Sequence, residues 1–269
     1  MISYCIKRPF QILMYLLLQI LFIPLALIGI VDGIHKGIIN SKKLGVSFSA
    51  CRALQYKWFM HYFETRPDPL TVQFIKKFPC ESHLGLLATF GPLILSQRLF
   101  GFETSLSKLD KPGEEGYLSF AGPRVIKFDE IVEKHIQEVE QIVMPGAGFD
   151  LLALKYTQGK KVKVFEIDQS ATINLKVETL KEAGIAFDQV TYIPVDYQNE
   201  SWSEKLQEAD FDQTQKTLFI WQSVSLFLEE ETVKETLKQM AALCTEDSIV
   251  VQDIYSDAYI SGKASKAVK

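Results

Sequence analysis

The sequence predicts an α/β protein built on a doubly wound parallel sheet, for three reasons. Short apolar runs alternate with amphipathic helical segments through the second half of the chain. One apolar run, at 141–145, ends in a glycine turn at 146–148. Another, at 161–167, brings the acidic residues Glu166 and Asp168 to its end. A glycine turn after one strand and an acid closing the next are typical of sheets that bind a nucleoside.

The composition of the 269-residue chain limits its partners. Charged residues make up 23% of the sequence and aromatic residues 12%, which is ordinary for a folded protein. A formal net charge of −4 gives no reason to expect nucleic acid as a partner. Cysteines and histidines are dispersed, without a C-x-x-C pair, so we expect free thiols, a reducing compartment and no metal site. They are Cys5, Cys51, Cys80, Cys244, His35, His61, His83 and His135.

An uncharged apolar segment occupies residues 10–31 near the N-terminus. At helical rise it covers about 33 Å, enough for the hydrocarbon core of a bilayer. We therefore predict a single-pass transmembrane helix at 10–31, in which Pro24 is tolerated, and a juxtamembrane linker at 32–45. A signal peptide is one alternative, but its apolar stretch is normally shorter and a small-residue cleavage site follows it. A buried core helix is the other, and it would need protein cover on all faces.

Basic residues flank this segment on both sides. Lys7 and Arg8 precede it, while Lys36, Lys42 and Lys43 follow it. The count weakly favours a cytosolic location for the part of the chain after the segment. A nucleoside-binding domain favours the same side, so we expect a membrane protein with its catalytic domain in the cytosol.

Residues 46–130 are predicted to form a helical lid region. Apolar positions recur there at three- and four-residue spacing, with breaks at 66–69 and 90–92. Prolines and glycines at 109–123 predict a loop over a ligand site, and a helix is expected at 128–140.

Residues 131–269 are predicted to form the ligand-binding α/β domain. Its strands are expected at 141–145, 161–167, 189–195, 217–223 and 248–254, and its helices at 150–157, 170–184 and 229–243. Ligands of such sheets bind beyond the carboxyl ends of the strands. We therefore expect Gly146, Glu166, Asp196 and Gln222 to gather at one edge of the sheet.

The residues around the glycine turn argue against a ligand that carries phosphate. Leu151 stands where a dinucleotide-binding turn has its third glycine, and Asp150 would repel phosphate at a helix N-terminus. Tyr259 and Lys263 match the Y-x-x-x-K spacing of short-chain dehydrogenases, but ten tyrosines make a chance match easy. A nicotinamide-dependent oxidoreductase is therefore the weakest of the alternatives.

S-adenosylmethionine suits the sequence better, because it carries a ribose and an adenine but no phosphate. Backbone N–H groups at Gly146 and Gly148 suit its carboxylate, and an amide such as Gln222 suits its ammonium group. Glu166 can accept both ribose hydroxyls, and Asp196 can accept from the adenine amino group. The ordinary alternatives are a solvated strand end for Glu166 and a loop cap for Asp196.

These segments together resemble the leucine carboxyl methyltransferase family, which includes protein-phosphatase carboxyl methyltransferases and polyketide O-methyltransferases. The likeness runs from about residue 46 to 254. The segments that carry it include GPRVIKFDEIV (122–132), VMPGAGFDLLAL (143–154), VFEIDQSATINLK (164–176) and KTLFIWQSVSLFL (216–228). The resemblance implies a class I methyltransferase fold, Rossmann-like, with an N-terminal helical lid and S-adenosyl-L-methionine as methyl donor.

The resemblance also implies roles for single residues. Arg124 matches an arginine that holds the donor carboxylate or a carboxylate acceptor. Gly146 and Gly148 match the donor-binding turn, Glu166 the ribose-binding acid and Asp196 the acid beside adenine. Without the resemblance, Arg124 is equally well explained as part of a surface ion pair.

The sequence departs from the family pattern after the fourth strand. Gln222 and Ser223 stand where the family usually has Glu-Gly, and Phe227 where it has a tyrosine. Gln222 brings no countercharge to an ammonium group, a loss of about 1–2 kcal/mol in donor affinity. The family fold also adds a helix and an antiparallel strand pair after the fifth strand, for which few residues remain.

The predicted function is an S-adenosylmethionine-dependent O-methyltransferase, with no catalytic residue assigned. Methyl transfer needs an aligned nucleophile under a water-excluding lid more than acid–base groups. A carboxylate of a small molecule or protein is ionised at pH 7 and needs no base, whereas a hydroxyl acceptor would need one. The main alternative is a catalytically impaired relative that binds a nucleoside or a partner protein.

Overall fold

The computed structural model describes residues 2–104, 107–109 and 121–255. The chain divides into two compact units, which we describe separately. The first comprises Met1–Glu115 with Glu182–Ile185, and the second Gly116–Lys181 with Ala186–Lys269. The division falls at Glu115 rather than at the predicted residue 130, so the helix that precedes the first strand belongs to the second unit. Most of the predicted 109–123 loop, and the pair Tyr259 and Lys263, lie outside the described residues.

The first unit is helical. Its elements are α1 (Ile2–Ile34), the π-helix η1 (His35–Asn40), α2 (Ser41–Lys43), α3 (Phe48–Tyr62), α4 (Pro69–Ile75) and α5 (His83–Phe100). The segment predicted as a linker, 32–45, is therefore helical as far as Lys43. Pro24 lies inside α1 without ending it.

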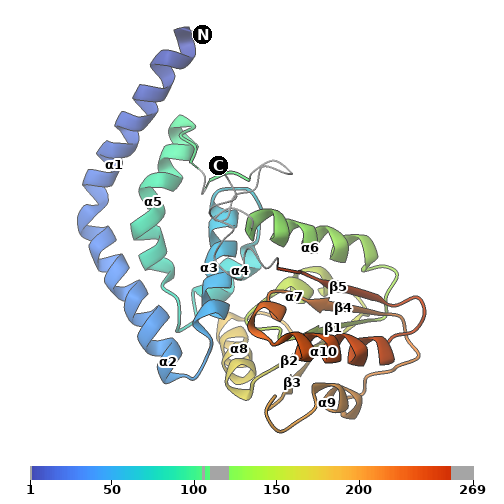
Figure 1. Ribbon diagram of the computed structural model, residues 1–269. Helices are drawn as coiled ribbons and strands as arrows, with labels where there is room; N and C mark the ends of the chain where they lie inside the picture. The colour runs from blue at the N-terminus through green and yellow to red at the C-terminus, as the bar shows by residue number, and fades with distance from the viewer. Residues whose placement is uncertain (1, 105–106, 110–120, 256–269) are drawn as a thin grey trace. The chain divides into compact units, whose positions relative to one another are not determined.

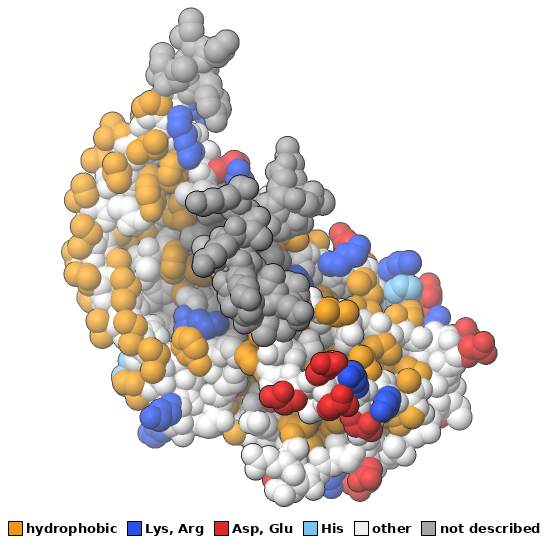
Figure 2. All heavy atoms as spheres, in the orientation of Figure 1, with side chains coloured by type: hydrophobic (Ala, Val, Ile, Leu, Met, Phe, Trp, Pro, Cys, Tyr) orange, Lys and Arg blue, Asp and Glu red, His pale blue; other side chains and the backbone are white. Residues whose placement is uncertain are grey.

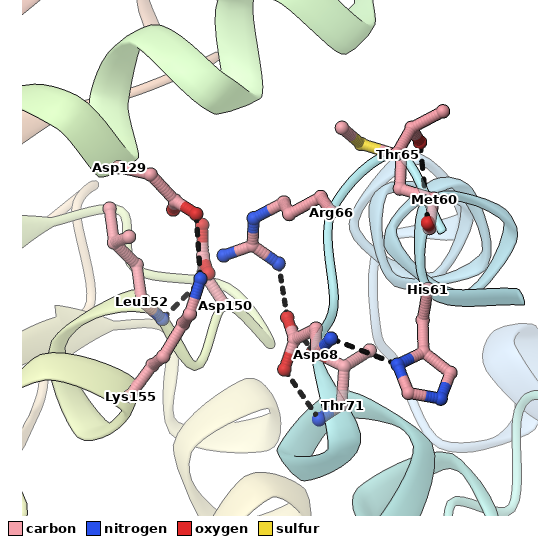
Figure 3. Close-up of polar contacts among 10 residues, drawn as sticks. All are labelled: Met60, His61, Thr65, Arg66, Asp68, Thr71, Asp129, Asp150, Leu152 and Lys155. Atoms are coloured by element: carbon pink, nitrogen blue, oxygen red, sulfur yellow. Dashed lines mark hydrogen bonds and ion pairs between the residues drawn. The ribbon is translucent and has the colours of Figure 1, made fainter. Parts of the chain in front are cut away.

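Polar side chains begin and end the helices of this unit. Ser47 accepts from the N–H of Ala50 at the start of α3, and Ser82 accepts from Gly85 at the start of α5. At α4, Asp68 occupies the N-cap position and Pro69 the first helical position. Figure 3 shows Asp68 within a local network, in which it accepts from Thr71 and its own N–H donates to His61 Nδ1.

α1 packs lengthwise against α5 (Figure 1). The helices approach closely at two glycines, where a Cβ built on Gly29 would lie 2.7 Å from the carbonyl oxygen of Gly85. Nearer the other end of α1, the Gln11 amide donates to the carbonyl oxygens of Phe100 and Gly101, at 2.7 and 2.9 Å. Gln11 therefore satisfies two acceptors that the end of α5 would otherwise leave unpaired.

Among the described residues, one helical stretch is apolar and long enough to cross a bilayer by length and composition, Lys7–Lys43. Its most apolar window has a mean hydropathy of 2.5, and 6% of that window is buried. The side chains of a core helix would be covered, so the core-helix alternative is not supported.

The second unit contains a five-stranded, fully parallel sheet with the strand order β3-β2-β1-β4-β5. The strands are β1 (Gln141–Pro145), β2 (Lys163–Asp168), β3 (Val190–Pro194), β4 (Thr217–Trp221) and β5 (Ile249–Gln252). The helices are α6 (Ala121–His135), α7 (Leu152–Thr157), α8 (Ser170–Ala183), α9 (Trp202–Glu208), the short η2 (Ser225–Phe227) and α10 (Glu230–Ala242). The predicted parallel sheet is confirmed.

β1 and β4 are buried at every position because they lie in the middle of the sheet. One cluster of buried residues joins the sheet to the helices of the C-terminal half and includes Val143, Phe165, Phe219, Trp221 and Met240. This rigid centre holds the carboxyl ends of the strands in place, and the sequence-predicted site residues lie at or beside these ends.

Candidate functional site

The glycine turn follows β1, as predicted. Gly146 and Gly148 have φ values of +71° and +55°, which only glycine adopts without strain. A Cβ on Gly146 would lie 2.6 Å from Val224 Cγ2, so this position also needs glycine for space. The N–H groups of Gly146 and Ala147 both donate to the carbonyl oxygen of Ile167, at 2.8 and 3.1 Å. These two donors are therefore engaged inside the protein.

Asp168 is the acidic residue that closes β2 beside the glycine turn. Its Oδ2 accepts from the N–H of Gly148 at 2.7 Å, and its Oδ1 accepts from the N–H of Gln169 at 2.7 Å. The residue is partly exposed, and a carboxylate with two such bonds still has lone pairs to offer. Asp168 thus offers a fixed, accessible acceptor at the carboxyl end of the strand.

Glu166, which the sequence analysis assigned to ribose, lies in the protein interior. Its side chain is completely buried and forms an ion pair with Lys176 of α8, whose side chain is also completely buried. Lys176 donates to the carbonyl oxygen of Asp150 as well. Burial raises the pKa of the Glu166 carboxyl, against the lowering effect of Lys176. A ribose cannot reach this carboxylate, so the assignment of Glu166 as the ligand-facing acid is wrong.

Sequence reasoning chose Glu166 over Asp168 because both acids stand near the end of the same apolar run. β2 continues to Asp168, two residues beyond Glu166. Residues two apart in a strand point to the same face, so the face does not distinguish Glu166 from Asp168. What distinguishes them is the strand end, because Asp168 lies at the edge of the sheet and Glu166 lies inside it. The second acid was visible in the sequence, but the strand end was placed one residue too early.

Arg124 of α6 belongs to a polar cluster at the ends of β4 and β5. Its guanidinium forms an ion pair with Asp253 Oδ2 at 2.8 Å and donates to the hydroxyl groups of Ser223 and Tyr255. Its side chain is 21% exposed. Sequence reasoning missed Asp253 and Tyr255, because the fold alone brings them to α6. Arg124 is therefore part of an internal ion pair in this structure.

Gln222 and Ser223 follow β4 and connect the Arg124 cluster to the glycine turn. Ser223 has a φ of +61°, a left-handed conformation that costs a non-glycine residue about 1–2 kcal/mol. Its N–H donates to both carboxylate oxygens of Asp253, at 2.9 and 3.0 Å. The next residue, Val224, lies against Gly146. Gln222 Oε1 is buried and has no hydrogen-bond partner among the residues that the structure describes, which leaves this acceptor unsatisfied at the edge of the sheet.

Asp196 follows β3, and its carboxylate is exposed. It accepts from the side chain of Asn199 and the N–H of Gln198, at 2.7 and 3.1 Å, and these bonds lower the pKa of the carboxyl group. Asp196 therefore acts as a loop cap in this structure and remains open to solvent.

Asp150 lies two residues before α7 (Leu152–Thr157), the helix that follows the glycine turn. Its Oδ1 accepts from the N–H of Leu152 at 2.9 Å, and a neighbouring ion pair joins Lys155 of α7 to Asp129 of α6 at 2.8 Å (Figure 3). A carboxylate already occupies this helix start, which disfavours a phosphate there. Within the described ranges, no group of three or more histidine, cysteine or acidic residues is placed to hold a metal ion.

The parallel sheet, the glycine turn and the acid that closes β2 define a nucleoside-binding α/β protein. The sequence model of the leucine carboxyl methyltransferase family matches residues 88–241, which is more than half of the chain. The chain belongs to this family, and its sheet has the α/β methyltransferase fold.

Curated relatives match the chain over part of their length. A protein of Frankia alni, provisionally named an S-adenosyl-L-methionine-dependent methyltransferase, is 26% identical over 146 residues, 52% of this chain and 51% of its own length. A protein of Mycobacteroides abscessus with the same provisional name is 29% identical over 123 residues, 44% of this chain and 40% of its own length. The chain thus spans about half the length of these relatives, or less.

Among solved structures, the S-adenosylmethionine-dependent methyltransferase SibL in its apo form is similar over 70% of this chain and 63% of its own. The TM-score is 0.39 and the sequence identity 12%.

Proposed function

We propose that the protein transfers a methyl group from S-adenosyl-L-methionine to an oxygen atom, with a carboxylate as the acceptor. The observation that carries this proposal is the accessible Asp168 carboxylate, held at 2.7 Å by the N–H of Gly148 at the carboxyl edge of the sheet. Membership of the leucine carboxyl methyltransferase family and the names of the curated relatives support it.

The residues of the site fit this methyl donor in part. Asp168 suits the ribose hydroxyls, and the unpaired Gln222 Oε1 suits the ammonium group. The exposed Asp196 remains the candidate for the adenine amino group. The donor itself supplies the methyl group and a sulfonium leaving group, and the protein would contribute binding and alignment.

The candidate hydrogen-bond donors for the carboxylate of the methyl donor already have partners within the protein. The N–H groups of Gly146 and Ala147 are engaged by Ile167, and Arg124 is engaged by Asp253. For Arg124 to hold a carboxylate, it would have to share its guanidinium between Asp253 and the ligand, or exchange one for the other. A guanidinium has five N–H donors, so sharing is chemically reasonable.

A carboxylate acceptor is favoured because it needs no general base. No histidine lies among the described residues that follow the strand ends, and an ionised carboxylate is already nucleophilic at neutral pH.

We also propose that α1 holds the protein at a membrane. The support is the length and composition of the stretch Lys7–Lys43 and the small buried share of its most apolar window. A nucleoside-dependent activity favours the cytosolic side for the second unit.

Calorimetric titration of the folded, full-length protein with S-adenosylmethionine and with its demethylated product tests the donor. We expect both compounds to bind and NADPH, titrated as a control, not to bind. The absence of heat at millimolar concentrations of the two compounds would contradict the proposal. Transfer of a labelled methyl group to lysate metabolites or proteins, followed by mass spectrometry, would then identify the acceptor.

A relative that binds the donor without transferring its methyl group is the second candidate. The paired Arg124 and the amide at Gln222 favour it, because each reduces the charge offered to the amino-acid end of the donor. Donor binding without methyl transfer to any fraction would support this candidate over the first.

A further inference from the structure

α1 carries a large apolar surface that protein does not cover. Its inward positions form a single stripe at three- and four-residue spacing, which includes Gln11, Phe22 and Gly29. The outward positions are aliphatic or aromatic along 10–31, with Leu13 54%, Ile20 65% and Leu27 60% exposed. Figure 2 shows these hydrophobic side chains gathered over the N-terminal helix. A soluble monomer rarely exposes so long an apolar surface.

The chemistry of this surface fits lipid. A protein partner normally brings about one hydrogen bond for every 100–200 Å² of interface, and the outward side chains of 10–31 offer almost no group that could form one. Exposed basic residues stand at both ends of the apolar stretch, with Lys7 and Arg8 before it and Lys42 and Lys43 after it. This arrangement suits acyl chains along the helix and anionic headgroups at its two ends.

A second helix layer, α5, follows α1 along its apolar stretch. Arg8 donates to the carbonyl oxygen of Glu103 at 3.2 Å, beyond the end of α5. A Cβ on Gly91, in the middle of α5, would lie 3.1 Å from the Phe22 ring. Asn40, past the other end of α1, donates to the carbonyl oxygen of Pro79 at 2.9 Å. α1 therefore cannot enter a membrane at a given depth without α5 beside it.

A third layer, α3 with α4, follows α5 on its other side. Trp58 donates to His83 at 3.1 Å, the rings of Phe59 and Phe90 lie 4.6 Å apart, and Arg98 donates to the carbonyl oxygen of Tyr62. Figure 1 shows α5 between α1 and α3. The last turns of α3 therefore pack on α5, on the side away from α1.

This third layer carries exposed polar and charged side chains. Glu64 has a side chain 74% exposed, and Gln73, Lys76 and Lys77 are exposed along and after α4. α4 begins beside His61, near one end of α3, and Pro79 after it reaches Asn40 past the other end of α1. Phe90, which contacts Phe59 near the end of α3, is next to Gly91 and therefore level with Phe22, in the middle of the apolar stretch. α4 runs from near this level toward the end of α1 that Asn40 follows.

Polarity in this unit thus also changes across the layers, from α1 to α4, at the level of the apolar stretch. A unit that crosses a bilayer is instead apolar on all sides at that level, with polar groups beyond its two ends. A spanning α1 would take the exposed carboxylate of Glu64, just after α3, toward the hydrocarbon core, at high cost.

We propose that α1 lies in the plane of the membrane, with its outward face in the acyl chains of one leaflet and α3 and α4 toward water. The first unit then binds to one leaflet of the membrane and does not cross it. This inference rests on the membrane association proposed above and is independent of methyl transfer.

The test uses the full chain, reconstituted in vesicles of phosphatidylcholine with a minor fraction of phosphatidylserine. Single cysteines at Leu13→Cys, Ile20→Cys and Leu27→Cys carry nitroxide labels, and immersion depth is measured by electron paramagnetic resonance with oxygen and a water-soluble nickel complex. Cys5 and Cys244 are replaced by serine, while Cys51 and Cys80 are fully buried and stay. Glu208→Cys, in the second unit, is the aqueous control, since its side chain is 66% exposed.

An in-plane helix places the three labels at similar depths, because residues seven apart lie on one helix face. A spanning helix places the label at residue 20 about 10 Å deeper than the other two, from seven residues at 1.5 Å each. That second result would overturn the in-plane proposal and leave membrane association standing. Labels that are all as accessible to nickel as the control would overturn both. Strong spin–spin broadening between copies would show that a second chain covers α1, which overturns the lipid proposal.

Discussion

The carboxylate of Asp168 accepts a hydrogen bond from the N–H of Gly148 at 2.7 Å, which joins the end of β2 to the glycine turn after β1. The acid two residues earlier, Glu166, is buried against Lys176. Two acids at the end of one strand therefore have different environments, and substitutions at them should have different consequences.

We expect Asp168→Asn to weaken binding of S-adenosylmethionine about tenfold or more, since the charge-assisted bonds to the ribose are lost while the shape is kept. The free energy of unfolding should fall by only about 1–2 kcal/mol, because the amide can accept from one of the Gly148 and Gln169 N–H groups but not from both. Glu166→Gln should instead lower the free energy of unfolding by about 3–5 kcal/mol, because it leaves the Lys176 ammonium buried without a countercharge. Calorimetry and thermal unfolding of both variants measure the difference. Equal loss of donor affinity in two well-folded variants would contradict the distinction.

Gly146→Ala should destabilise the second unit by about 2–4 kcal/mol, from the positive φ and from contact with Val224. Gly159→Ala is the matched control, since Gly159 has a φ of +73° but a Cβ there would meet no atom within 4 Å. Gly159→Ala should lower the free energy of unfolding by about 1 kcal/mol, the cost of the positive φ alone. Adding Val224→Ala should restore part of the stability of Gly146→Ala, and no difference between the two glycine variants would argue against the close contact.

Gln11→Leu should weaken the packing of α1 on α5, because two carbonyl oxygens at the end of α5 lose their donor. The expected cost is about 1–3 kcal/mol in detergent micelles. Gln19→Leu is the control, because the Gln19 amide donates to the hydroxyl of Tyr15 on its own helix. Its cost should be below about 1 kcal/mol. Chemical denaturation of both variants in the same detergent gives the comparison.

His61 should make the stability of the first unit depend on pH. Burial lowers the pKa of His61, against the raising effect of Asp68, and its Nδ1 accepts from the N–H of Asp68 at 2.9 Å. The folded state therefore binds the proton less readily than the unfolded state. Stability is complete above the unfolded pKa of about 6.5 and falls as the pH drops from there through the lower folded value.

His61→Asn keeps an acceptor near the Nδ1 position but does not titrate in this range. The difference in unfolding free energy between wild type and this variant should therefore shrink or reverse as the pH falls from 8 to 5. Comparison with the variant removes the contribution of the other histidines. A difference that stays constant with pH would show that His61 does not carry the effect.

The sheet was predictable because its signals are local. β1 was predicted at its observed residues, and β3, β4 and β5 to within two residues at each end, since each strand is a short apolar run bounded by polar residues or glycine. α6 begins at Ala121, seven residues before the predicted helix, because the glycine and proline before Arg124 are residues typical of a loop. Proline is tolerated in the first turn of a helix, so this signal was ambiguous.

The site was predictable only in part, because its contacts join distant parts of the sequence. Gly146 and Gly148 lie at the turn where the pattern placed them, with positive φ. The pairing of Arg124 with Asp253 depends on how α6 lies beside the ends of β4 and β5, which no local pattern encodes. Similarly, the apolar character of 10–31 is evident from the sequence. Its packing against α5 is not, because no pattern in the sequence of α5 indicates which helix it contacts.

The close approach of Gly29 and Gly85 has a practical consequence for anyone who produces this protein. Trimming the N-terminal forty residues to gain solubility would bare the groove of α5 into which the trimmed helix fits, together with Leu86 and Phe90 nearby. The shortened protein would lose the exposed apolar surface of α1 but would expose the apolar surface of α5 instead. Work on the intact polypeptide in lipid or detergent is the sounder route to its chemistry.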